Sequence, residues 1–358
     1  MNLRPSLEAA APEWRARLER MFDRMHFILG EQVAAFEREF ALATGARYAA
    51  GVGSGTGAIE LCLRAARVTS GNQQVITSPL TAPFTGLAIL AAGAAPRFAD
   101  IDPETLLLDP DDAGNRMSRR TAAILPVHLY GQPCDLRRFA ALGKILIQDA
   151  CQAHGARHRA KPLTAYSPYV AYSFYPTKNL GCLGDGGAVA TNSRRVAARI
   201  KLLRDGGRGS NHVSLVAGVN SRLDEMQACY LSAFLPHLDA WNAQRARIAA
   251  WYDAALAGCS AVRPVRRGAE SVNHLYVVRV PHRERLRRRL AELGIGSGVH
   301  YPVPLHLHPA FAGCGAKRGD LVQAERAARE ILSLPIWPYL GQTEVQRVAE
   351  SIVGFYRR

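Results

Sequence analysis

The sequence of 358 residues lacks the features of several specialised protein classes. No apolar run reaches the length of a membrane span, although hydrophobic residues make up 48% of the chain. Residues 1–15 include acids and lack the apolar core of a secretory signal peptide. The sequence shows no internal repeat and no low-complexity linker. These absences favour a globular, cytoplasmic protein that is long enough for two domains.

Cysteine is scarce and shows no organised spacing. The seven cysteines are scattered and include no CxxC pair, a pattern that fits reduced thiols better than a disulfide framework. Cys62, Cys151, Cys182 and Cys229 stand among apolar or small residues. We interpret these four as packing residues.

Positive charge, in contrast, is in surplus. The chain has 45 Lys and Arg against 30 Asp and Glu, a formal net charge of +15, which favours anionic partners. Nucleic acid and a nucleotide sugar with its diphosphate are both candidates. The arginine-rich run at 283–289 is typical of a solvated helix face. Because zinc-finger spacing, a helix-turn-helix and aromatic-basic alternation are all missing, we expect no nucleic-acid partner.

Strand-like and helical runs alternate through the first half of the chain. Strands are expected at 48–53, 74–77, 95–98, 122–127, 144–148, 170–174 and 187–190, and helices at 13–25, 31–43, 58–66, 83–92 and 136–142. This alternation predicts an α/β fold with a mostly parallel sheet between helices.

The pattern changes after a long helical stretch at 223–256, which is broken near Pro236. Beyond it, strands are expected at 274–280 and 298–301 and helices at 283–293 and 343–356. We therefore expect two domains, a large one at 1–240 with an N-terminal helical segment and a small α+β one at 241–358.

The stretch Ser173–Leu180 and the glycines around Asp185 place a single lysine, Lys178, between two short apolar runs. This pattern predicts an amine on a tight turn between two buried strands. Desolvation disfavours the ammonium form, and a neutral lysine amine attacks carbonyls to form Schiff bases. Taken alone, Lys178 could also be an ordinary loop lysine.

An apolar run at 145–147 is followed, after Gln148, by an acid, Asp149. This acid lies about thirty residues before Lys178. An acid at the carboxyl end of a buried strand lies where α/β sheets bind ligands. Such a carboxylate can keep the ring nitrogen of pyridoxal phosphate protonated, although it could instead cap a following helix. The pair Asp149 and Lys178 suits a pyridoxal-phosphate site.

A third motif, Ser54-Gly55-Thr56-Gly57-Ala58, lies between an expected strand and a helix. Free amides at a helix N-terminus bind phosphate, and the glycines permit close approach. The motif is neither a dinucleotide-binding GxGxxG nor a P-loop. A helix cap without a ligand is the alternative interpretation.

Together these segments resemble the DegT/DnrJ/StrS family of pyridoxal-phosphate-dependent sugar aminotransferases. The resemblance runs from about Ile28 to Tyr356 and rests on several segments in the family's order. They are 28–30 with 36–37, 54–56, 93–94 with 100–102, 126–131, 149–155, 173–180, 220–223, and 300–302 with 305–306.

The resemblance implies the aspartate-aminotransferase-like fold, fold type I, with pyridoxal 5'-phosphate as cofactor. It implies catalytic roles for Lys178 and Asp149. The other cofactor contacts that it implies are Thr56 and the Gly57 amide at the phosphate, Ser173 as a second phosphate ligand, Gln152 beside the phenolic oxygen, and Asn220. In the family the residue matching Asn220 reaches the cofactor of the neighbouring subunit, so a homodimer with shared active sites is expected.

One position departs from the family. An aromatic residue usually stacks on the cofactor ring in a Thr-aromatic pair, but here that pair is Thr81-Ala82. Phe84 lies two residues later. Either Phe84 supplies the stacking through a local shift of the backbone, or the ring face is covered otherwise.

Substrate contacts are implied for His300, Tyr301 and His306 at the edge of the sugar site, with Tyr175 as a further candidate. His306 and His308 alternate, but neither acid nor cysteine lies nearby in sequence, so we expect no metal.

The reaction implied is transfer of an amino group from an amino acid, L-glutamate by resemblance, to the keto group of a nucleotide-linked sugar. It would run as a ping-pong cycle through a Schiff base on Lys178. A keto-cyclitol aminotransferase of the same family is one alternative. A non-enzymatic regulator is another, and the presence of both Lys178 and Asp149 disfavours it.

Overall fold

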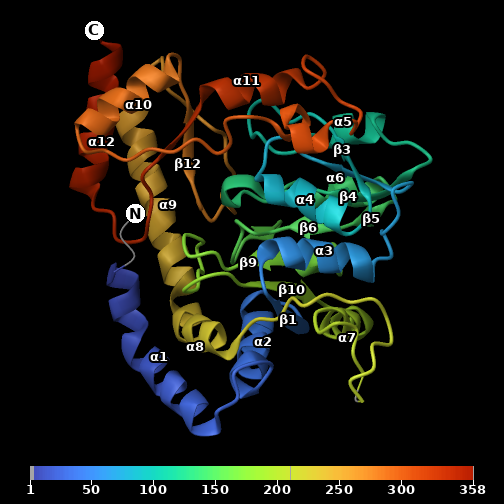
Figure 1. Ribbon diagram of the computed structural model, residues 1–358. Helices are drawn as coiled ribbons and strands as arrows, with labels where there is room; N and C mark the ends of the chain where they lie inside the picture. The colour runs from blue at the N-terminus through green and yellow to red at the C-terminus, as the bar shows by residue number, and fades with distance from the viewer. Residues whose placement is uncertain (1–3, 210, 358) are drawn as a thin grey trace.

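The computed structural model describes residues 4–209 and 211–357 (Figure 1). The helices are α1 (Arg4–Arg24), α2 (Glu31–Ala43), α3 (Gly55–Ala65), α4 (Pro83–Ala91), α5 (Pro110–Asn115), α6 (Leu136–Ala141), α7 (Arg194–Leu203), α8 (Glu225–Phe234), α9 (Leu238–Leu256), α10 (Arg283–Glu292), α11 (Val322–Glu330) and α12 (Gln342–Tyr356). Short 3-10 turns are η1 (Leu129–Gly131), η2 (Leu163–Ala165), η3 (Leu235–His237), η4 (Leu305–Leu307) and η5 (Pro309–Phe311). Within the described residues, no helix combines the length and apolar character needed to cross a bilayer.

The strands are β1 (Tyr48–Val52), β2 (Gln74–Thr77), β3 (Ala95–Phe98), β4 (Thr121–Leu125), β5 (Ile145–Leu146), β6 (Gln148–Asp149), β7 (Arg157–His158), β8 (Lys161–Pro162), β9 (Val170–Ser173), β10 (Gly187–Thr191), β11 (Arg263–Pro264), β12 (Tyr276–Arg279) and β13 (Ile331–Leu334). Most of them belong to one central sheet.

The central sheet consists of two four-stranded halves, ordered β3-β2-β4-β5 and β1-β10-β9-β6. The halves are continuous because only Ile147 separates β5 from β6, and its amide donates to Ile124 O at 3.0 Å. Pairing is parallel from β3 across to β9 and antiparallel on both sides of β10. The carboxyl ends of the parallel strands therefore meet along one edge, which is where α/β sheets bind ligands.

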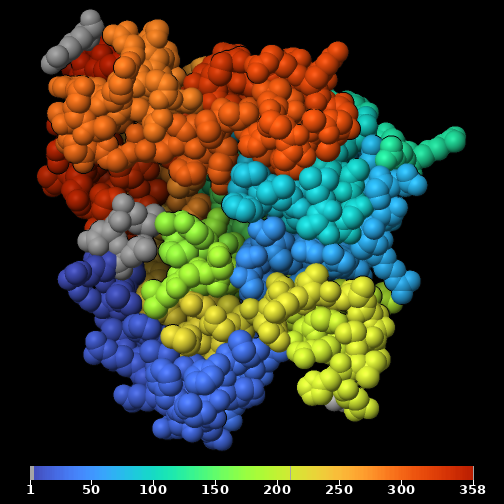
Figure 2. All heavy atoms as spheres, in the orientation of Figure 1, coloured from blue at the N-terminus to red at the C-terminus, as the bar shows by residue number. Residues whose placement is uncertain are grey.

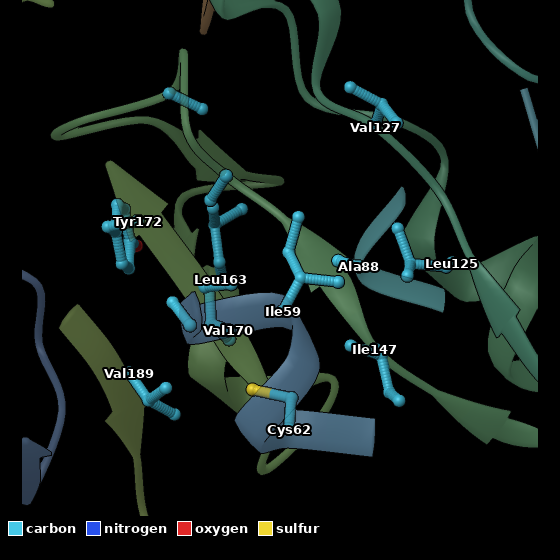
Figure 3. Packing of buried hydrophobic residues seen from close by; sticks show 14 of the residues in the cluster. Ile59, Cys62, Ala88, Leu125, Val127, Ile147, Leu163, Val170, Tyr172 and Val189 are labelled. Atoms are coloured by element: carbon cyan, nitrogen blue, oxygen red, sulfur yellow. The ribbon is translucent and has the colours of Figure 1, made fainter. Parts of the chain in front are cut away.

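Helices cover this sheet because most residues of its strands are apolar and buried. All five residues of β10 are buried, as expected for a strand with both faces covered. Part of the cover is α3, whose Ile59 and Cys62 lie among Val170 of β9 and Val189 of β10 (Figure 3). Full burial of an aliphatic side chain such as Ile59 contributes about 1.5–3 kcal/mol to folding.

A second apolar cluster lies toward the C-terminus, in the orange and red region of Figure 1. Helices α9, α10 and α12 enclose it against the antiparallel sheet β11-β12-β13. Its buried members include Ile248, Tyr252, Val278, Leu286 and Ile352. The boundary that we expect between residues 240 and 241 falls near the start of α9, and the division into two domains stays a prediction.

The chain between β12 and β13 does not stay with this second cluster. Leu305 and Phe311 pack into the larger cluster around the central sheet, as does most of the buried face of α11. The carboxylate of Asp100 caps α11, accepting bonds from the amides of Gln323 and Ala324 at 2.9 Å each. Asp100, which precedes α5 in the chain, thus fixes the start of α11 more than two hundred residues later.

A second carboxylate holds the start of α2. Glu225, which is 2% exposed, accepts bonds from the amides of Gly30 at 2.9 Å, Gln32 at 2.8 Å and Val33 at 2.8 Å. These amides belong to the first turn, where helix amides lack intrahelical partners and the helix dipole favours negative charge. Glu225 therefore joins the N-termini of α2 and α8.

The expected elements at 31–43, 74–77 and 95–98 are confirmed at both ends. The helix expected at 58–66 starts earlier, at Gly55, because Ser54 caps it through a bond from the Gly57 amide to Ser54 Oγ. The strand expected at 298–301 is wrong, since only an isolated bridge joins Gly298 to Ser333. The tight turn expected around Lys178 is also wrong: residues 174–186 form a longer loop between β9 and β10. Helix α11 and strand β13 have no counterpart among the elements expected from the sequence.

We expect the Glu225→Ala variant to lose about 2–4 kcal/mol of unfolding free energy, because three first-turn amides lose a charged, buried acceptor. Urea unfolding followed by circular dichroism measures this. Glu31→Ala is the matched control, since Glu31 also lies in the first turn of α2 but is exposed, and it should change stability by less than about 0.5 kcal/mol. Equal effects of the two substitutions would contradict the capping role.

Candidate active site

A cavity of about 720 Å³ opens where the central strands reach their carboxyl ends. Its wall joins the start of α3, the start of α4, the loop after β9 and the chain around residue 300. Most of the predicted site residues line it: Thr56, Phe84, Asp149, Gln152, Ser173, Tyr175, Lys178, His300 and Tyr301. Residues that are far apart in the sequence thus line one cavity.

Asp149 ends β6 and is 4% exposed. Its Oδ2 accepts a bond from Thr85 Oγ1 at 2.8 Å, and its Oδ1 accepts one from the Cys151 amide at 3.1 Å. With a donor on each oxygen, the carboxylate is fixed in orientation. No helix follows Asp149, because the next residues form turns, so the alternative role as a helix cap is wrong.

Lys178 lies in the loop between β9 and β10, where its amide donates to Tyr175 O at 2.9 Å. Burial lowers the pKa of its amine below the usual 10.5, and the nearby Cys151 and Asp149 oppose that shift. Lys178 therefore offers the cavity an amine with a raised neutral fraction.

The N-terminus of α3 meets β9 at the same cavity. Gly55 lies so close to Ser173 that an added Cβ would stand 2.6 Å from Ser173 Cβ and 2.8 Å from Cys151 Sγ. Only glycine fits there. Gly55 and Thr56 contribute first-turn amides, and Thr56 and Ser173 contribute hydroxyls, which together form a donor set suited to an anion such as phosphate.

Gln152 has a fixed orientation between two tyrosines. Its Oε1 accepts a bond from the Tyr130 amide at 2.7 Å, and its Nε2 donates to Tyr301 Oη at 3.2 Å. The Tyr130 hydroxyl in turn donates to the carbonyl of His300. Burial raises the pKa of Tyr301 to about 12, so this phenol stays protonated at neutral pH.

Three predicted site residues do not line the cavity in this chain. The Gly57 amide donates to Ser54 Oγ at 3.0 Å, so Gly55 and Thr56 are better placed than Gly57 to hold an anion. Asn220 is exposed, and its backbone pairs with that of Asp205. His306 is buried, with Nε2 at 3.1 Å from Glu325 Oε1.

Phe84 and Tyr175 do line the cavity, but both side chains are more than half exposed. Phe84 belongs to the first turn of α4, one residue before the Thr85 that contacts Asp149. Its stacking on a cofactor ring, and the contact of Tyr175 with substrate, stay predictions.

Sequence reasoning missed several residues of the site. Thr85 and Tyr130 orient Asp149 and Gln152, and His274 lines the cavity beside Lys178. Thr81 precedes the helix expected at 83–92 and Thr85 lies in its first turn, so their contact, with hydroxyls 3.2 Å apart, could not be read from helical spacing. Cys151 also lines the cavity, so its interpretation as a packing residue is incomplete.

Comparison with known proteins identifies the class to which this fold and site belong. The profile of the DegT/DnrJ/EryC1/StrS aminotransferase family matches residues 9–353. The chain is 42% identical to a "Pleiotropic regulatory protein" of Geobacillus stearothermophilus, covering 100% of this chain and 98% of that one. It is 40% identical to the dTDP-3-amino-3,4,6-trideoxy-alpha-D-glucose transaminase of Streptomyces venezuelae, covering 98% of this chain and 94% of the relative.

A solved structure, that of S. venezuelae DesV in complex with ketimine intermediate, superposes with a TM-score of 0.96 at 39% identity. The superposition covers 100% of this chain and 98% of that one. The chain therefore belongs to the DegT/DnrJ/EryC1/StrS aminotransferase family. It is a pyridoxal-phosphate-dependent aminotransferase of fold type I, which confirms the expected fold class and cofactor.

The residues of the cavity fit this cofactor. Pyridoxal phosphate needs an amine for its aldehyde, a carboxylate for its ring nitrogen and donors for its phosphate. Lys178, Asp149 and the donor set of Gly55, Thr56 and Ser173 provide these groups on the walls of a single cavity.

We expect replacement of Lys178 by methionine to stabilise the apoprotein near neutral pH. The folded state depresses the pKa of Lys178, so it binds fewer protons than the unfolded chain, and this costs stability below the unfolded pKa of 10.5. The gain in melting temperature of Lys178→Met should therefore shrink as pH rises toward 10.5. Differential scanning fluorimetry between pH 7 and 10 measures it, and a gain that grows with pH would contradict the burial argument.

Proposed function

We propose that this aminotransferase moves an amino group from an amino acid, L-glutamate, to the C3 keto group of a nucleotide-linked sugar. The observation that carries the proposal is that Lys178 and Asp149 face one cavity in a chain of this family. Its similarity to a transaminase named for a dTDP-linked 3-amino sugar supports the acceptor and the position.

Two residues of the cavity carry the chemistry of this reaction, Asp149 and Lys178. When bound, pyridoxal phosphate supplies an electron sink for the carbon that carries the amino group. Asp149, fixed by Thr85 and the Cys151 amide, holds a proton at the ring nitrogen of the cofactor. The amine of Lys178 takes a proton from the amino-bearing carbon of the donor and later returns one to the sugar carbon.

The remaining groups bind and orient. Thr56, Ser173 and the first-turn amides of α3 hold the phosphate. Gln152 would donate to the phenolic oxygen, and the Tyr130 amide fixes the orientation of its side chain. His300, Tyr301 and Tyr175 border the space left for the sugar. The net charge of +15 favours approach of the nucleotide diphosphate.

We further propose a cytoplasmic homodimer with shared active sites. An exposed apolar surface supports the dimer. Its members Ile28, Leu183 and Met226 are 39%, 53% and 49% exposed. They lie close together because Ile28 pairs with Asp224 and the Leu183 amide donates to Gln227 Oε1, and these two partners flank Met226 in the sequence. Residues 211–219, in yellow, belong to a segment that projects from the body of the molecule (Figure 2). Asn220 follows this segment, is exposed and does not line its own cavity, which supports a contact with the cofactor of a partner subunit.

We expect the purified enzyme to aminate dTDP- or UDP-linked 3-keto hexoses with L-glutamate, and to act on the matching 4-keto hexoses and on keto-cyclitols at least tenfold more slowly. Chromatography of the products, with 2-oxoglutarate as the co-product, measures this. Preferred amination of a keto-cyclitol would replace the proposed function with that alternative. Failure to aminate any of these acceptors, in a protein that also binds no cofactor, would favour a regulator.

The Asp149→Asn variant is the control for the assigned chemistry. It keeps the shape of the side chain but cannot hold the ring proton, so kcat should fall by a factor on the order of 10² or more.

Borohydride reduction of the wild-type holoenzyme should attach the cofactor to Lys178 in peptide mapping. Attachment at Lys144 or Lys201 would refute the assignment.

We expect mixed dimers to regain activity that neither parent has. Lys178→Ala loses the amine and Asn220→Ala loses a phosphate contact from the partner, so exchange of subunits should create one site with both residues intact. The assay compares the mixture with each variant mixed with itself. A fully active monomer in size-exclusion chromatography would contradict the shared site.

A further inference from the structure

His274 lines the cavity beside Lys178 but has no part in the reaction described above. The residue is 5% exposed, and its Nδ1 lies 3.0 Å from Asn179 Oδ1. Asn179 follows Lys178 directly and is itself 4% exposed. A buried amide and a buried imidazole thus meet at the loop that carries the reactive amine.

A backbone carbonyl decides which way this amide faces. The side-chain nitrogen of Asn179 lies 2.9 Å from the carbonyl of Val272, which can only accept a hydrogen bond. Nδ2 must therefore occupy that side, and Oδ1 must face His274. Since Oδ1 only accepts, Nδ1 of His274 carries the proton.

A second carbonyl confirms the same orientation from the other side. Asn179 Nδ2 also donates to Asn242 Oδ1 at 2.8 Å, and Asn242 Nδ2 donates to the carbonyl of His154 at 2.9 Å. Reversal of the Asn179 amide would place its oxygen against the carbonyl of Val272, and reversal of the Asn242 amide would place its oxygen against the carbonyl of His154. The network is therefore anchored at both ends by groups that cannot change roles.

The imidazole of His274 is neutral. Burial lowers its pKa well below the usual value, and the nearby Arg245 guanidinium lowers it further. In a neutral ring with the proton on Nδ1, Nε2 carries a lone pair. Nε2 has no partner among the described residues and is not sealed inside the protein, and His274 is part of the cavity wall.

We propose that His274 determines substrate specificity by accepting, through Nε2, a hydrogen bond from a hydroxyl of the sugar, with Asn179 as the positioning residue that fixes its tautomer. This inference rests on the proposed function, because the sugar substrate supplies the hydroxyl.

The acceptor character of Nε2 selects the sugar over the amino-acid donor. A donor such as glutamate presents carboxylates, whose oxygens repel a second acceptor. Its amine is the group being transferred and is engaged at the cofactor. Near the reacting carbon, the hexose hydroxyls remain the groups with a free proton. A buried acceptor that loses its donor is left unsatisfied, which penalises a deoxy sugar.

The tautomer is tested directly by nuclear magnetic resonance. Holoenzyme labelled with isotopic nitrogen in histidine should give a two-bond nitrogen–proton pattern for His274 with the proton on Nδ1, assigned by its loss in His274→Asn. In Asn179→Leu the pattern should change toward the Nε2-protonated form. A proton on Nε2 of His274 in the wild-type holoenzyme would overturn the proposal.

Recognition is tested by binding. The pyridoxamine form of the holoenzyme cannot react with an amino sugar, so calorimetry can give the affinity for the dTDP-linked 3-amino hexose and for its 2-, 4- and 6-deoxy analogues. The wild type should bind one analogue about tenfold more weakly than the parent. His274→Asn, which keeps the donor to Asn179 but loses Nε2, should bind both with the weaker affinity.

Leu275→Val is the matched control, since Leu275 adjoins His274 on the same wall and has no polar side-chain atom. It should shift the affinities for parent and analogue equally. If His274→Asn keeps the wild-type discrimination, or if the wild type discriminates against none of the analogues, the role of His274 is refuted. Failure of the wild type to aminate any keto nucleotide sugar would instead refute the proposed function, so the two failures are separable.

Discussion

The cost of burying the Lys178 amine is the constraint on which the rest of the site depends. An ammonium without a carboxylate beside it is expensive to keep in an apolar environment, so the amine shifts toward its neutral form. The site also needs an acid, Asp149, and a close contact between this carboxylate and the Lys178 amine would restore the positive charge of the amine. The fold satisfies both needs because β6 and β9 are neighbours: Asp149 ends one strand, and Lys178 lies in the loop that follows the other.

The surroundings of the two groups are correspondingly fixed. Thr85 and the Cys151 amide take up the oxygens of Asp149, and they hold the carboxylate in place without a cation. Behind Lys178, the side chain of Asn179 is bonded to α9 through Asn242 and to the carbonyl of Val272. The reactive amine therefore lies on a loop that is tied to the helix leading into the second cluster.

Much of this arrangement could be predicted from sequence, and the exceptions have physical causes. Lys178, Asp149, Thr56 and Ser173 stand next to elements with strong local signals, and parallel strands bring their carboxyl ends together. The role of Gly55 depends on its distance from Ser173, which no spacing along the chain reveals. His274 was hidden for a similar reason: it precedes an ordinary buried strand, and only the tertiary contact with Asn179 sets it apart. The helix α11 was missed because its apolar face is mostly alanine, and a carboxylate far away in the sequence caps it.

The return of the chain between β12 and β13 to the larger cluster has a consequence for how the protein is made. A nascent chain folds as it leaves the ribosome, and an N-terminal domain usually completes its core first. Here the core around the central sheet includes Leu305, Phe311 and the buried face of α11. The first two thirds of the protein therefore keep part of their apolar surface uncovered until the residues up to 331 have left the ribosome. Protection of that surface by a chaperone matters most in this interval.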